Sequence, residues 1–134
     1  MKLIFLGKYS DFGLLLLRVG IGVMYLYHGF PKIMGGPEKW AKLGSAMQFV
    51  GVSAIPVFWG FMAAASEFGG ALLLITGFFF RPACIFLAIT MSVAASMHLG
   101  KGDGLQVASH AIENGVMFIG LLFIGPGKYS LDRK

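Results

Sequence analysis

Four long apolar runs follow one another along most of this chain. They cover about residues 12–29, 57–80, 83–98 and 105–124. A helix that crosses the hydrocarbon core of a bilayer needs roughly 20 apolar residues. Charged residues make up only 13% of the chain, whereas a soluble domain carries about 25%. The sequence therefore predicts a single integral membrane domain over residues 1–134, with no room for a separate soluble domain.

The runs predict helices rather than the strands of a membrane barrel. Barrel strands alternate between apolar and polar residues, and these runs are too long and too uniformly apolar for that alternation. In lipid, a helix satisfies its backbone polar groups within the segment. Arg81 and Pro82 indicate a tight turn between the second and third spans, and residues 100–104 another before the fourth. We expect an all-α membrane protein, an antiparallel bundle of four transmembrane helices.

The connection between the first two spans is long and has a different pattern. Trp40, Leu43, Met47 and Val50 follow one another at i, i+3, i+7 and i+10. That spacing places them on one face of a helix. An amphipathic helix is therefore predicted over about residues 38–50, lying at the membrane surface or covering the mouth of the bundle.

The basic residues stand at the ends of the spans, which excludes a nucleic-acid-binding face for the net charge of +5. The first span lacks a small-residue cleavage site, so we expect it to be retained. Four spans place both termini on one side of the membrane, and the positive-inside rule favours the cytoplasm for that side. Its basic residues outnumber those opposite: Lys2, Lys8, Arg81, Lys128, Arg133 and Lys134 against Lys32, Lys39, Lys42 and Lys101. The single cysteine, Cys84, excludes a disulfide within the chain.

Three ionisable residues lie deep in the predicted spans. Counting helical rise puts Glu67 about 15 Å and Glu113 about 12 Å from the outer ends of their spans, and Arg18 about 9 to 10 Å from the inner end. An ionised residue at a helix centre costs about 2.5 to 3.5 kcal/mol. We interpret all three as a buried proton or ligand site. A direct contact from Arg18 to a glutamate is stretched, and water, Tyr25 or Asn114 could bridge it.

A second polar group lies in the outer half of the predicted bundle. His28 and His98 end their spans, and His110 shares a helical face with Asn114 at i+4. We expect a polar vestibule that binds a ligand through these side chains and Lys32. Interfacial hydrogen bonds for the histidines, and a headgroup anchor for Lys32, are the simpler interpretations. No metal is expected, although three histidines make a metal site conceivable.

Several motifs recur in an order that resembles the DoxX family of small four-span membrane proteins. The resemblance covers nearly the whole chain. It includes His98 and the Glu113 position, with Phe80 as a departure because a threonine often precedes Arg81. It rests on the segments "YHGFPK", "GVSAIP", "SEFGGALLLITGFFFRP" and "GPGKYSLD".

The resemblance implies a bacterial or archaeal inner membrane protein of redox physiology. Members of the family are linked to quinol oxidase and thiosulfate oxidation systems, quinone detoxification, and thiol or superoxide defence. The leading hypothesis is a membrane subunit of an oxidoreductase system that binds a quinone-like or small sulfur-containing ligand. Glu67 and Glu113 would exchange the accompanying proton. The sequence indicates no haem, flavin or iron–sulfur site, so electrons would come from a partner protein or a bound quinone.

Two alternatives from other functional classes stay open. The chain could be a non-catalytic membrane binding or assembly protein, in which the buried polar network only fixes the helix register. It could also be a small proton-coupled transporter, for which four spans favour a homo-oligomer. The sequence does not decide whether any reaction is catalysed.

Overall fold

The computed structural model describes residues 3–132, which fold into helices and connecting turns without a strand. Lys2, Arg133 and Lys134, counted above for the orientation, lie outside this described part. The elements in chain order are η1 (Ile4–Tyr9), α1 (Ser10–Ile33), α2 (Gly36–Gly44), η2 (Ser45–Val50), α3 (Pro56–Thr76), α4 (Phe80–Gly100) and α5 (Leu105–Ile124).

Four helices are long and apolar enough to cross a membrane, namely η1 with α1, α3, α4 and α5. The expected all-α bundle of four spanning helices is confirmed. The fourth span has the predicted bounds, Leu105–Ile124. The first span is longer than predicted, because α1 continues through Pro31 and ends at Ile33. Lys32 therefore belongs to the last turn of a spanning helix.

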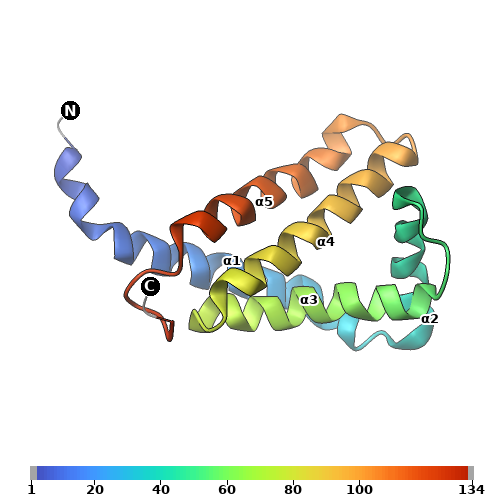
Figure 1. The fold of residues 1–134 in the computed structure, drawn as a ribbon, viewed down its shortest axis with the longest axis horizontal. Helices are drawn as coiled ribbons and strands as arrows, with labels where there is room; N and C mark the ends of the chain where they lie inside the picture. The colour runs from blue at the N-terminus through green and yellow to red at the C-terminus, as the bar shows by residue number, and fades with distance from the viewer. Residues whose placement is uncertain (1–2, 133–134) are drawn as a thin grey trace.

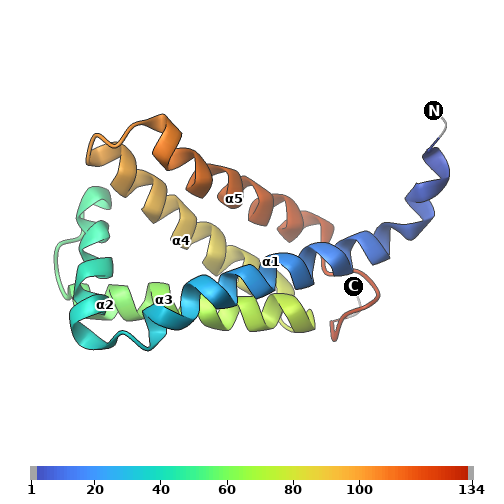
Figure 2. The same ribbon diagram turned by 180° about the vertical axis from the view of Figure 1, so that it is seen from behind.

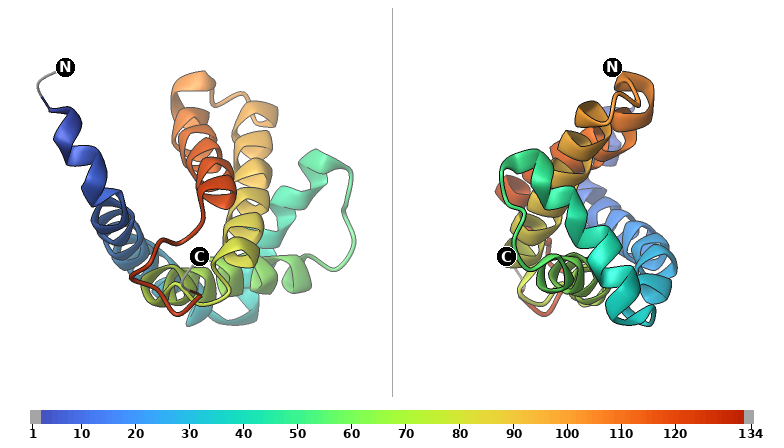
Figure 3. Two further views of the ribbon diagram at one scale, coloured as in Figure 1. Left: turned by 60° about the vertical axis from the view of Figure 1, so that its left-hand side comes forward. Right: turned by 90° about the vertical axis from the view of Figure 1, so that its right-hand side faces the viewer.

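The four spanning helices form two pairs. In Figures 1 and 2, α1 runs along α3 and α4 runs along α5, while α3 joins the pairs by packing against α4. Within the described residues, no Cα of α1 lies within 8 Å of a Cα of α4 or α5. Figure 3 shows the α4–α5 pair standing away from α1. The bundle is therefore open along one side, between α1 and α5.

The turn between α3 and α4 lies earlier than Arg81 and Pro82, so that prediction was wrong. The chain turns at residues 77–79, where Gly77 and Phe79 adopt positive φ angles of 70° and 46°. Pro82 lies in the first turn of α4, where a missing N–H is tolerated. The carboxylate of Asp132, far away in sequence, accepts hydrogen bonds from Phe79 N and Phe80 N at 3.1 and 2.8 Å. This contact caps the start of α4.

The predicted amphipathic segment forms two short elements, α2 and η2, at one end of the bundle. α2 packs against α3 so closely that a Cβ atom on Gly60 would collide with the Trp40 backbone. η2 continues onto α4, where Phe49 lies against Gly100. In Figure 1 the segment runs across the end of the spanning helices. Of the two predicted placements, it therefore fits the one that covers the bundle mouth.

Candidate functional site

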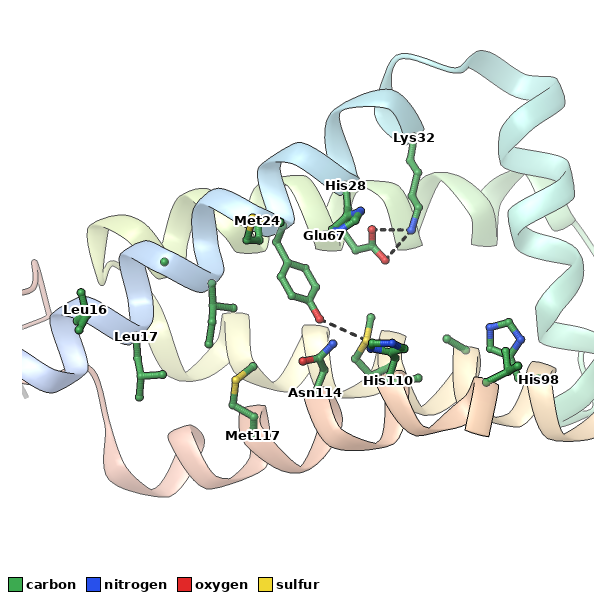
Figure 4. Close-up of a pocket in the computed structure, with 17 residues that line it drawn as sticks. Leu16, Leu17, Met24, His28, Lys32, Glu67, His98, His110, Asn114 and Met117 are labelled. Carbon is green, nitrogen blue, oxygen red and sulfur yellow. Dashed lines mark hydrogen bonds and ion pairs between the residues drawn. The ribbon is translucent and has the colours of Figure 1, made fainter. Parts of the chain in front are cut away.

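The open side of the bundle contains a cleft with a volume of about 670 Å³. All four spanning helices contribute to its walls (Figure 4). α1 and α5 form the two sides, and side chains from α3 and α4 lie between them. The cleft exists because α1 packs on α3 but diverges from α4 and α5.

The two ends of the cleft differ in polarity. Figure 4 shows Leu16, Leu17 and Met117 toward one end and His98 at the other. Helical periodicity explains why these residues line the cleft together, since residues three, four and seven apart lie on one face of a helix. The polar lining side chains are His28, Lys32, Glu67, His98, His110 and Asn114. The cleft therefore runs from an apolar end to a polar end within the membrane-spanning part of the chain.

Lys32 and Glu67 form an ion pair in the wall of the polar end. Lys32 Nζ lies 3.0 Å from Glu67 Oε1 and 2.8 Å from Glu67 Oε2. Glu67 is only 5% exposed, whereas the side chain of Lys32 keeps 32% exposure. Trp40 Nε1 donates a 2.9 Å hydrogen bond to the Lys32 carbonyl and ties α2 to the end of α1. Lys32 is thus the ion-pair partner of Glu67, a contact that neither interpretation of Lys32 from the sequence included.

Tyr25 extends from α1 toward the opposite helix pair, between the two ends of the cleft. Its hydroxyl donates to Met91 Sδ at 3.4 Å. Its ring meets Phe118 edge-on, with centroids 5.4 Å apart. A thioether is a weak acceptor, so the phenol remains available to a stronger acceptor that enters the cleft. The sequence predicted Tyr25 only as a possible bridge between Arg18 and a glutamate. Nothing in the sequence indicated that Met91 would line a cleft.

Arg18 forms no hydrogen bond or ion pair with Glu67 in the described residues, so it does not join the buried site that the sequence predicted for the two. Its side chain is buried and donates to the carbonyls of Leu74 and Ile75, at 3.1 and 3.3 Å, and to that of Tyr129. Leu74 and Ile75 belong to the last turn of α3, whose carbonyl end carries partial negative charge. Arg18 therefore joins α1 to the end of α3 and to the C-terminal segment, away from the cleft.

Glu113 also lies outside the cleft. It is exposed on α5 and does not line the cavity, although its neighbours His110 and Asn114 do. Successive helical residues are rotated by roughly 100°, which carries Glu113 onto the neighbouring face. The two glutamates therefore do not share one interior.

The three histidines all line the cleft, but they do not form a metal centre. Of the three, only His98 has a hydrogen-bond partner among the described residues, Asp103 Oδ2 at 2.9 Å from its Nδ1. Across residues 3–132, no three His, Cys, Asp or Glu side chains lie close enough together to hold a metal ion. His28 on α1 and His110 on α5 lie on opposite walls of the cleft (Figure 4). Their imidazoles can serve as hydrogen-bond donors or acceptors to a ligand.

The profile of the DoxX family matches residues 13–99, a stretch that includes both Lys32 and Glu67. The chain belongs to the DoxX family. This DoxX protein is 31% identical over 144 residues to Inner membrane protein YphA of Escherichia coli, covering 95% of this chain and 97% of the relative. Its identity to Inner membrane protein YqjF of the same organism is 28%, with 94% of each chain covered.

A shorter match connects this DoxX protein to Bacillus subtilis. The protein named "Putative oxidoreductase CatD" is 30% identical over 86 residues, which cover 64% of this chain and 59% of that protein. No solved structure matches. Together with the four apolar helices, the relatives establish a multi-span membrane protein similar to bacterial inner membrane proteins.

Proposed function

We propose that this DoxX protein is a membrane subunit of a redox system and that its cleft binds a quinone-like ligand from the bilayer. The observation that carries the proposal is the change in polarity along the cleft. Leu16 and Leu17 line one end, and the Lys32–Glu67 pair lines the other. A quinone has the same division, with an apolar tail and a ring that carries two carbonyl oxygens. The name of the Bacillus subtilis relative supports the redox part of the proposal.

The donors of the cleft suit the two carbonyl oxygens of such a ring. Tyr25, Lys32 and His110 all line the cavity, and each carries a hydrogen-bond donor. Met24 and the leucines of α1 would pack against the tail. Precisely placed polar groups in an otherwise apolar cavity are typical of small-molecule sites. Arg18 and Glu113 have no part in this site, because neither lines the cleft.

Reduction of a quinone to a quinol consumes two electrons and two protons. In this proposal the electrons come from a partner redox protein. The Lys32–Glu67 pair would pass protons to the carbonyl oxygens as the ring is reduced, and His28, which lines the cleft one turn before Lys32 on α1, would relay protons to the pair. The reverse sequence would release the protons during quinol oxidation.

The open side of the bundle favours a ligand dissolved in the membrane over a water-soluble sulfur compound. Since no Cα atom of α1 lies within 8 Å of one of α5 in the described residues, the cleft would face the hydrocarbon between these helices. At the polar end, α2 and η2 lie across the bundle (Figure 1). A ligand with an apolar tail can therefore enter laterally without leaving the bilayer. We also propose that the termini lie in the cytoplasm, as the distribution of basic residues favours.

The test is to purify the protein in mild detergent, extract and identify bound lipophilic ligands, and titrate the protein with decylubiquinone. We expect saturable binding by the wild type. Glu67→Gln removes the charge that holds the Lys32 ammonium in the cleft, so its affinity should fall about tenfold, the size of one charge-assisted hydrogen bond. The matched control is Glu113→Gln, the same substitution outside the cleft, which should bind like the wild type.

Three results would count against the proposal. The first is that the wild type takes up no quinone. The second is that Glu67→Gln and Glu113→Gln bind decylubiquinone with equal affinity. A purified protein that carries no quinone but retains a stoichiometric partner protein would instead favour the assembly function. Thermal unfolding of each variant separates loss of ligand from loss of fold, because only a structural role for Glu67 predicts that both change together.

A further inference from the structure

Glu113 is an ionisable side chain in a spanning helix, and it has no partner in the part of the chain that the structure describes. It follows the start of α5 by eight residues, about 12 Å along a helix of roughly 30 Å. It is exposed, and within residues 3–132 it makes no hydrogen bond or ion pair. The other charged side chains deep in the spans both have partners within the described residues: the terminal guanidinium nitrogens of Arg18 donate to carbonyls, and Glu67 pairs with Lys32. In a lone chain the carboxyl of Glu113 would face hydrocarbon.

The surroundings of Glu113 fit contact with another helix better than contact with lipid. Val116 and Gly120 follow at i+3 and i+7 on the same face, and Val116 is 65% exposed. Gly120 is exposed, and no atom lies within 4 Å of the position that a Cβ would take. A small residue at such a site lets two helix backbones approach closely. A carboxyl group beside it would supply a hydrogen bond between the helices.

We propose that this face of α5 is the interface between two copies of the chain, related by a two-fold axis along the membrane normal. That axis places the two Glu113 side chains at the same depth. One carboxyl group and one carboxylate then satisfy each other through a single shared proton, so the contact needs no cation. A cyclic dimer is the commonest closed assembly, and its interface uses the same surface on both copies.

The charges of the chain favour this pairing over an ion pair between copies. Arg18 is buried against backbone carbonyls, and Lys32 is bound to Glu67. The remaining described basic residues stand at helix ends or in loops: Lys8, Lys39, Lys42, Arg81, Lys101 and Lys128. None of them lies at the level of Glu113 in a second copy of the same orientation. Self-association therefore pairs the carboxyl group with its own counterpart.

The proposed interface and the cleft use different residues of α5. His110 and Asn114 line the cleft, whereas Glu113 and Val116 do not line it and are exposed. A substitution at Glu113 or Val116 therefore changes the interface without removing a lining residue of the cleft. The dimer does not depend on the identity of the ligand.

Disulfide cross-linking tests the interface directly. Val116→Cys places a thiol on the proposed face, and the native Cys84 is fully buried, so it adds no background. Oxidation in nanodiscs should produce a covalent dimer of Val116→Cys. Ile89→Cys, a 55% exposed position on α4, is the matched control and should remain monomeric.

Two substitutions at Glu113 identify the chemistry of the contact. Glu113→Leu, added to Val116→Cys, should abolish the cross-linked dimer. Leucine is favourable at a lipid-facing site, so this variant should fold, and retained decylubiquinone binding would confirm that. Glu113→Gln should keep the dimer, because an amide both donates and accepts a hydrogen bond.

The proposal fails if Val116→Cys does not cross-link, or if Glu113→Leu leaves the cross-link intact. Loss of the dimer in Glu113→Gln as well would also overturn it, since that result requires an ionised carboxylate at the contact rather than a shared hydrogen bond. Quinone binding is measured separately, so failure of the interface and failure of the proposed function give different results.

Discussion

Arg18 and Glu67 are both buried charges in membrane spans, but their surroundings are opposite in kind. Arg18 is 1% exposed, and its guanidinium donates only to backbone carbonyls at the junction of α1, α3 and the C-terminal segment. Glu67 is held by one cation, Lys32, whose side chain remains partly exposed in a cleft. The first charge holds helices and the C-terminal segment together, whereas the second lines a cleft.

The two charges differ because the C-terminal segment forms hydrogen bonds at the Arg18 end of the bundle, whereas a cleft lies at the Glu67 end. Near Arg18 the C-terminal segment adds hydrogen bonds from Leu131 N to Thr76 O and from Asp132 N to Gly77 O, each 3.1 Å long. Lys128 N donates to Asp11 Oδ1 at 3.1 Å and fastens the same segment to α1. At the other end α1 leaves the α4–α5 pair, and a cleft takes the place of such contacts.

Arg18→Leu should have the largest effect on stability. It leaves the carbonyls of Leu74, Ile75 and Tyr129 without their donor in a buried site, so we expect a loss of about 3 kcal/mol in the free energy of unfolding. Thermal or denaturant unfolding in detergent measures this loss. Arg81→Leu is the control, because Arg81 is exposed and makes one hydrogen bond, from Nε to Leu122 O. Similar losses in both variants would contradict the structural role of Arg18.

Asp132→Ala should come next, with a loss of about 1 to 2 kcal/mol, as expected for removal of a helix cap. The carboxylate accepts from the first backbone N–H groups of α4, and alanine leaves both without a partner. The same unfolding measurement applies, with Asp103→Ala as a control at the opposite end of α4. Equal stability of Asp132→Ala and the wild type would mean that the C-terminal segment does not hold α4.

The sequence predicts the four spans well, because hydropathy depends on local composition. The start and end of α5 are correct for this reason. The turn at residues 77–79 was not predictable in the same way, since its cap, Asp132, comes from a segment more than 50 residues away. A proline after an arginine was the stronger local signal, although proline is equally acceptable in the first turn of a helix.

The candidate site shows the limit of counting depth along helices. Depth alone made Arg18 and Glu113 the companions of Glu67, but a contact also requires that helices face one another and that side chains point inward. The ion pair between Lys32 and Glu67 was not predicted, because the first span was expected to end before Pro31. Once the helix includes Lys32, its side chain leans toward the N-terminal part of α1 and reaches Glu67.

A double-mutant cycle measures how much the Lys32–Glu67 pair contributes to the free energy of unfolding. This value can be compared with the loss expected for Arg18→Leu. Lys32→Gln and Glu67→Gln should each change stability by less than Asp132→Ala, with a coupling energy of about 1 kcal/mol, because Lys32 is partly exposed. Both single variants should lose decylubiquinone affinity. A coupling energy as large as the effect of Arg18→Leu would show that this pair also serves mainly to hold the fold.

Tyr25→Phe should have the smallest effect on stability, within about 0.5 kcal/mol, because the lost hydroxyl donates only to the weak thioether acceptor of Met91. The ring and its edge-on contact with Phe118 remain in place. Affinity for decylubiquinone should nevertheless fall by about tenfold, the value of one hydrogen bond to a ligand oxygen. Tyr27→Phe is the control, since Tyr27 is 72% exposed and lies outside the cleft. A Tyr25→Phe variant that loses stability but keeps its affinity would reverse the contrast with Arg18, because the phenol would then stabilise the helix packing rather than bind the ligand.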